Sequence, residues 1–316
     1  MLRSEFDNLT RWDGKEKPFY EVYYLKLNDP QYKVGLWLRY TFLSPTEGKP
    51  SASLWASFFS AQHPEKNIAL KETVTMKEAV FLKGKLSLDI GGALLTNSSA
   101  SGAIREEKGA ISWDIHWQPH EESYRHYPWP LYYLPWPRSK VVAPNLNVPA
   151  FGWFDANGVK YQFSTILHQG HIWGKYHTDK WIWANCGIFK EDHSAVLELL
   201  SKPPLGLGFL KVGGEKIRFR FKCDYAFNGC KFEGSKKNVR VSGRISADPA
   251  SVLGITYDDP KGDKRYCYNS KVADAVVDIE RKSRGRWVHD RRLTSTATTA
   301  YEMVLSRPLS AIRLSI

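Results

Sequence analysis

Apolar and polar residues alternate with a period of two along most of this chain, a pattern typical of strands with one buried face. A first run, over residues 19–27, stops at the turn-forming Asn28-Asp29-Pro30, and a second run follows over 33–43. Together they predict a long antiparallel hairpin. Further strands are expected at 53–60, 80–90 (broken at 83–85), 109–117, 150–154, 159–167, 209–212, 217–225, 230–233, 239–247, 252–257, 272–281, 286–289, 300–305 and 311–316.

Helical periodicity is scarce. Only residues 194–200 suggest a helix, and a short one. Because no long helices alternate with the strands, a parallel α/β sheet is disfavoured. Short strands separated by turn signals instead predict an all-β protein of antiparallel barrels or sandwiches with little helix.

Two segments interrupt the strand pattern. Residues 118–149 contain seven prolines, which argue against regular structure, yet this stretch is rich in Trp, Tyr and Leu. A long apolar loop of this kind is expected to pack over a cavity or around a barrel end. The second interruption, at residues 202–206, resembles a domain boundary. We therefore expect two β units, residues 1–190 (with the loop 118–149) and residues 191–316.

Composition narrows the class of protein. The 316 residues include 12 Trp, 16 Tyr and 15 Phe, an aromatic content of 14% that suits half-buried strand surfaces. The N-terminus has no apolar signal segment and no apolar run is long enough to span a bilayer, which favours a cytoplasmic location. The four cysteines are few and scattered, so buried free thiols are expected rather than a disulfide framework.

The formal net charge is +12, and much of the basic excess lies after residue 200. Most of these Lys and Arg residues alternate with apolar residues or lie in turns, as on a solvated sheet face. Weak contact with an anionic membrane surface stays open as a second interpretation. Nucleic acid binding would rest on charge alone and is not expected.

The densest unusual segment runs from Gly170-His171-Ile172-Trp173-Gly174 to Trp181-Ile182-Trp183-Ala184-Asn185-Cys186-Gly187-Ile188-Phe189. In a strand, Trp181 and Trp183 point to the same side, and Asn185 follows them on that face. Such a row either fills a core or provides a cavity wall with one polar group.

This segment resembles a motif of the lipocalin-like superfamily that includes carotenoid hydratases, tocopherol cyclases and AttH-like proteins. In that family a His-x-Trp-Gly element precedes a Trp-x-Trp strand, a Cys-Asn pair and a Phe. The matching residues here are His171, Trp173, Gly174, Trp181, Trp183, Cys186 and Phe189, whereas Gly187 stands where the family has Asn. The resemblance implies two tandem lipocalin-like (calycin) barrels, with a ligand site in the first barrel or at their junction.

The resemblance also implies a class of chemistry. Carotenoid hydratases and tocopherol cyclases protonate an alkene or guide addition across it without a redox cofactor, so a desolvated carboxylic acid or a His is the expected proton donor. Candidate catalytic residues are His171, Asp114 and Glu302, with Asp89 and Glu233 as weaker alternatives. By strict alternation Asp114 faces away from Trp113, toward solvent, and His171 can equally be a structural histidine.

We therefore expect a cofactor-independent enzyme that hydrates, cyclises or isomerises an apolar isoprenoid- or polyketide-like molecule. A non-catalytic protein for a lipophilic ligand is the first alternative, and a β-sandwich that stacks sugars on Trp129, Tyr133 and Trp136 is the second. No metal site is expected, because His116, His120 and His126 lack accompanying ligands. The residues expected to line the substrate cavity are Trp113, Trp153, Tyr161, Trp173, Trp181, Trp183 and Asn185.

Overall fold

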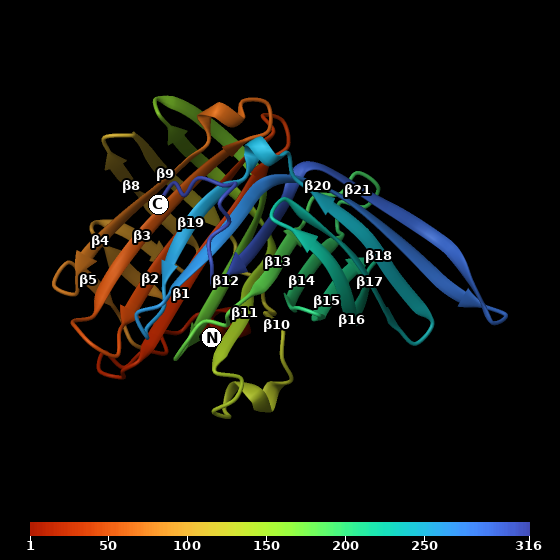
Figure 1. Cartoon of the computed structure of the whole chain (residues 1–316), viewed down its shortest axis with the longest axis horizontal. Coiled ribbons are helices and arrows are strands. Elements are labelled where there is room, and N and C mark those ends of the chain that lie inside the picture. The colour runs from red at the N-terminus through yellow and green to blue at the C-terminus, as the bar shows by residue number, and fades with distance from the viewer.

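The computed structural model describes residues 1–316, which form two antiparallel β-sheets, each curled into a barrel (Figure 1). The first sheet has the strand order β4-β3-β2-β1-β12-β11-β9-β8-β7-β6-β5, and β10 pairs with β11. Its strands are β1 (Phe19–Asp29), β2 (Val34–Ser44), β3 (Ser51–Ser60), β4 (Ile68–Thr75), β5 (Ala79–Phe81), β6 (Ser87–Ile90), β7 (Ala93–Thr96), β8 (Ser99–Glu106), β9 (Gly109–Trp117), β10 (Tyr124–Arg125), β11 (Ser139–Ala156) and β12 (Val159–Gly174).

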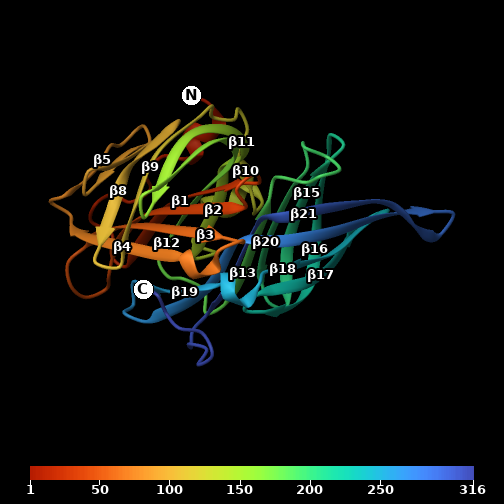
Figure 2. The same ribbon diagram turned by 90° about the horizontal axis from the view of Figure 1, so that it is seen from above.

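The second sheet closes on itself, because β18 pairs with both β17 and β20. Strand β19 lies outside this closed ring and pairs with the first part of β20, whose last part pairs with β18. The hairpin of β20 and β21 extends beyond the rest of the second barrel in both views (Figures 1 and 2). The strands of the second sheet are β13 (Trp181–Cys186), β14 (Val196–Lys202), β15 (Leu205–Val212), β16 (Glu215–Ala226), β17 (Gly229–Lys236), β18 (Val239–Ser246), β19 (Leu253–Asp258), β20 (Lys264–Ser283) and β21 (Arg286–Leu305).

Helical structure is limited to one five-residue helix and three short 3-10 turns. They are α1 (Arg3–Asp7), η1 (Pro64–Lys66), η2 (Trp129–Tyr132) and η3 (Pro249–Ser251). No helix has the length and apolarity that a membrane span requires. The prediction of an all-β protein made of two barrels is confirmed.

Each barrel has its own apolar core, and a third apolar cluster joins them. Strand β1 is buried along its whole length because each of its faces packs against something. Tyr23 and Leu25 point into the first barrel, while Tyr20, Val22 and Tyr24 point toward the second sheet. They meet residues of β13 and β19–β21, so the strands at the junction carry apolar residues on both faces.

Several local predictions are wrong. Residues 194–200 form strand β14, not a helix, and residues 202–206 are the turn of the β14–β15 hairpin, not a domain boundary. Strand β11 starts at Ser139, within the segment expected to be irregular. It accommodates Pro144 at a register shift between Val142 and Asn145 against β12. Residues 311–316 contribute only one isolated bridge.

The chain passes from the first sheet to the second once, in the link between Gly174 and Trp181. Strand β13 pairs with β14 and β21, so the last part of the expected unit 1–190 belongs to the second sheet. All four cysteines are free. Cys230 lies opposite Tyr225 across the β16–β17 hairpin, and Cys223 lies opposite Phe232.

Candidate functional site

A tapering cavity lies at the junction of the two sheets. Three adjoining compartments make it up: an inner chamber of about 60 Å³, a middle compartment of about 400 Å³ and an outer compartment of about 700 Å³. His177 lines all three. The inner and middle parts are largely apolar, and both are lined by Tyr20, Val141, Ile172, His177, Trp181 and Leu200.

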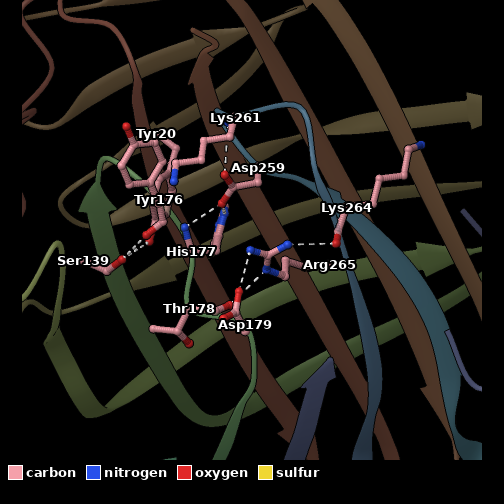
Figure 3. A network of polar contacts seen from close by, with 10 residues as sticks. All are labelled: Tyr20, Ser139, Tyr176, His177, Thr178, Asp179, Asp259, Lys261, Lys264 and Arg265. Carbon is pink, nitrogen blue, oxygen red and sulfur yellow. Dashed lines mark hydrogen bonds and ion pairs between the residues drawn. The ribbon is translucent and has the colours of Figure 1, made fainter. Parts of the chain in front are cut away.

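His177 is held in place by a carboxylate and by aromatic rings from both barrels. It belongs to the link between β12 and β13, and its backbone N–H donates to Asp259 Oδ2 at 2.7 Å. Its ring Nδ1 lies 3.2 Å from the same oxygen (Figure 3). The ring stacks on Tyr20 of β1 at 3.9 Å and lies parallel to Trp181 of β13 at 5.9 Å between centroids. Its orientation is therefore fixed by these two rings and by the carboxylate at one edge.

The electrostatics of this pair suit a neutral histidine. Burial lowers the pKa of His177, and its hydrogen bond to Asp259 opposes this only in part. Burial alone would raise the pKa of Asp259, but hydrogen bonds from the ring and backbone of His177 and from the Lys261 N–H outweigh it, so this pKa is lowered. At neutral pH an ionised Asp259 thus accepts the Nδ1 proton of a neutral imidazole. Nε2, which has no hydrogen-bond partner in the protein, keeps its lone pair.

The inner chamber contains two charged side chains. Glu302 of β21 lines it and accepts a hydrogen bond of 2.6 Å from the fully buried Lys271 Nζ, which also donates to Asn269. The Lys271 ammonium lies 5.3 Å from the ring of Trp37 and 5.5 Å from that of Trp183. Arg39 of β2 is the second charged residue.

A fully buried polar network lies alongside the cavity wall. Glu198 of β14 accepts hydrogen bonds from Trp183 Nε1 (2.8 Å) and Asn185 Nδ2 (3.0 Å), and His126 Nε2 lies 3.0 Å from its Oε1. Asn185 Oδ1 accepts from Lys26 Nζ. This network ties the segment around His126 and strand β1 to the second barrel.

Three of the residues expected at a substrate site do line the cavity. Trp181, Trp183 and Glu302 all contact the inner chamber, and the two tryptophans lie on one strand face as expected. Asn185, on the same face, belongs to the buried network rather than to the cavity lining.

His171 and Trp173 lie outside the cavity. Along β12 they alternate with Gly170 and Ile172, so they face the first barrel. His171 is fully buried, with Nδ1 2.7 Å from the Asp7 carbonyl oxygen and Nε2 2.8 Å from Glu21 Oε1. Both ring nitrogens have hydrogen-bond partners within the protein. His171 is therefore a structural histidine, the alternative to a catalytic role that the sequence left open.

Asp114 does not face the cavity either. It pairs with His116 at 3.0 Å on the outside of β9, and its side chain is 41% exposed, because strict alternation places it opposite the buried Trp113. The other expected lining residues also lie in or on the first barrel. Trp113 is in its core, Tyr161 packs against that core, and Trp153 lies under Lys160 Nζ at 4.0 Å.

Sequence reasoning missed His177, Asp259 and Arg39. His177 lies within the singled-out segment, but its neighbours Lys175 to Lys180 look like a solvated turn. A signal for Arg39 was available, because it shares a strand face with Trp37. No group of three or more His, Cys, Asp or Glu side chains is arranged to hold a metal ion.

At the position where the family motif has Asn, Gly187 has no space for a side chain. An ideal Cβ there would lie 2.0 Å from Asn147 Oδ1. The amide of Asn147 therefore fills the space that an Asn at position 187 would need.

The chain resembles two known proteins in sequence over most of its length, and no family model matches it. Two proteins of Mycobacterium tuberculosis, uncharacterized protein MT0513 (strain CDC 1551 / Oshkosh) and uncharacterized protein Rv0493c (strain ATCC 25618 / H37Rv), are each 23% identical over 292 residues. In each case the match covers 86% of this chain and 84% of the relative.

Among solved structures, the Nitrosomonas europaea protein NE1406, provisionally named AttH, is similar over its whole length. The TM-score is 0.55 with 10% identity, and the match covers 94% of this chain and 98% of that protein. At this identity the likeness establishes the fold alone.

Proposed function

We propose that this protein binds an apolar small molecule in the cavity between its two barrels and moves a proton on it, with His177 as the acid–base group. The observation that carries the proposal is the His177–Asp259 pair, which opens on an aromatic-lined cavity. A neutral, oriented imidazole at the wall of a largely apolar site is a suitable general base.

The chemistry needs no electron transfer. Nε2 takes a proton from the ligand, or from a water that adds to it, and the ionised Asp259 stabilises the imidazolium that forms. The same nitrogen then returns the proton to another ligand atom. Isomerisation by a proton shift fits this cycle, as do cyclisation and hydration at an alkene conjugated to a carbonyl group, which holds the negative charge until the proton returns. An isoprenoid- or polyketide-like skeleton fits the apolar lining.

Binding is tested first with N-phenylnaphthylamine, a neutral apolar fluorophore. We expect its emission to rise on binding, and Trp181→Ala to weaken binding about tenfold, as the loss of one large apolar contact predicts. The matched control is Trp153→Ala, which removes a tryptophan outside the cavity and should leave binding unchanged. Absence of binding by the wild-type protein would contradict the proposal.

Proton transfer is tested on the natural ligand, extracted from the protein isolated from its source cells and identified by mass spectrometry. Incubation of that ligand with the protein in D₂O should introduce deuterium. His177→Gln should abolish this exchange, and Asp259→Asn should slow it by several hundredfold or more, since Asp259 holds the ring tautomer. Exchange that persists in His177→Gln would assign the chemistry to another group. Absence of exchange in the wild type would refute proton transfer and would leave only the ligand-binding part of the proposal.

An exposed aromatic pair favours a second candidate function. Trp129 and Tyr133, on and just after η2, have ring centroids 4.9 Å apart, and both residues are exposed. Such rings can stack on a sugar. Titration with cello- and maltooligosaccharides, followed by tryptophan fluorescence in wild type and Trp129→Ala, tests it. An unchanged spectrum in the wild type would remove this candidate.

A further inference from the structure

Arg39 is a buried cation that lacks a counter-ion. It lies on the face of β2 that carries Trp37 and is 5% exposed. Its Nε donates to Thr41 Oγ1 at 3.0 Å, which is its single hydrogen bond within the protein, and it forms no ion pair. Its guanidinium lies 3.9 Å from the ring centroid of Tyr257 and 5.5 Å from that of Trp55.

The other buried cations are all well supplied with oxygen acceptors. Lys271 donates to Glu302 and Asn269, and Lys26 donates to Asn185 and to a backbone carbonyl. Lys140 donates to two carbonyl oxygens, and Arg265 donates to Asp179 and to two carbonyl oxygens. Arg39 is the exception, with one acceptor for five N–H donors.

The unused donors of Arg39 face the cavity. Arg39 lines the inner chamber. Its two terminal nitrogens have no partner within the protein, and neither is fully enclosed by protein atoms. Aromatic faces attract a guanidinium but accept none of its in-plane hydrogen bonds. A buried charge left in this state is costly, so an anion in the chamber is its natural partner.

The charge balance of the chamber selects a monoanion. The Glu302 carboxylate is neutralised by Lys271 at 2.6 Å, which leaves Arg39 as the one uncompensated charge. A carboxylate matches the fork of a guanidinium with two parallel hydrogen bonds. A doubly charged phosphate would exceed the single positive charge that Arg39 offers, and a chamber of about 60 Å³ has little room for it.

We infer that Arg39 is the anion-recognition residue of this cavity, and that the ligand is an apolar molecule with one carboxylate that occupies the inner chamber. This inference rests on the proposed function and names its ligand class. The apolar body then extends past Ile172 and Leu200 toward the outer compartment. His177 contacts the inner chamber too, so the proton it moves is near the carboxylate end.

The test is displacement of bound N-phenylnaphthylamine by three probes of equal chain length: decanoate, decanol and decylamine. In the wild type we expect decanoate to displace the fluorophore at a concentration at least about tenfold lower than decanol, the size of effect that a charge-assisted hydrogen-bonded pair supports. Decylamine should be the weakest of the three.

Variants locate the source of that preference. Arg39→Gln should remove the difference between decanoate and decanol while N-phenylnaphthylamine still binds, and Arg39→Lys should retain part of it. The matched control is Lys202→Gln, which removes an exposed cation of the middle and outer compartments and should leave the preference intact.

The outcomes separate the two proposals. If the wild type binds the fluorophore but does not distinguish decanoate from decanol, the carboxylate inference is wrong and the proposed function stands. A preference that is lost in Lys202→Gln and kept in Arg39→Gln also overturns the role of Arg39. If the fluorophore does not bind the wild type at all, the proposed function itself fails.

Discussion

The buried carboxylate of Glu198 offers a direct test of how the cavity wall is held. It accepts from Trp183 and Asn185 and contacts His126, which comes from the first sheet's proline-rich segment. Burial would raise the pKa of Glu198, but the nearby His168 and His126 and the Trp183 hydrogen bond lower it overall. The group is therefore an ionised acceptor at neutral pH.

Glu198→Ala removes the acceptor and leaves buried donors unpaired. Loss of one partner of a buried, hydrogen-bonded charge typically costs about 3–5 kcal/mol, so we expect the free energy of unfolding to fall by about 4 kcal/mol. Glu198→Gln keeps one acceptor oxygen and should cost about half as much. The measurement is urea denaturation followed by tryptophan fluorescence.

A double-mutant cycle with His126→Ala isolates the contact across the junction. We expect a coupling energy of at least about 1 kcal/mol, because the two residues share one network. Hydrogen exchange should also become faster over residues 118–138, since His126 anchors this segment. A loss below about 1 kcal/mol for Glu198→Ala, or independent effects of the two substitutions, would refute this account of the junction.

Two further predictions concern groups beside the cavity. Gly170→Ala should lower the free energy of unfolding by about 1–3 kcal/mol in urea denaturation, since an ideal Cβ would lie 2.1 Å from the Tyr24 ring; an unchanged stability would show that this ring moves freely. Burial lowers the pKa of His168 from 6.5 to about 4. The unfolded chain therefore binds the extra proton between these values, and the free energy of unfolding should fall by up to about 3 kcal/mol as the pH drops through this window. In denaturation measured at a series of pH values, His168→Gln should reduce that slope, and an identical slope would contradict the assignment.

The alternation of apolar and polar residues predicted the fold correctly where a strand has one solvent-exposed face. In β9 it places Trp113 in the first core and Asp114 outside, as the structure has them. It failed for β14, where Val196 to Leu199 are all buried. This strand packs on both sides, and a short continuous apolar run has no period that separates strand from helix.

The site was harder to predict than the fold because its parts are distant in sequence. Asp259 lies 82 residues after His177, in a stretch that looks like an ordinary turn, and nothing local couples the two. Trp181 and Trp183 were identifiable because they share one short strand. The sequence places Arg39 on one strand face with Trp37, but the burial of that face became evident only from the packing of β2 against the second sheet.

The single link between the barrels, residues 175–180, makes the candidate site depend on the folding of both barrels. It carries His177, whose carboxylate partner directly follows β19 of the second sheet and whose stacking partner Tyr20 is in β1 of the first. The acid–base pair is therefore complete only when both barrels have folded and docked. A half-folded chain lacks the assembled His177–Asp259 pair, so the chemistry proposed for this pair requires both barrels to be folded and docked.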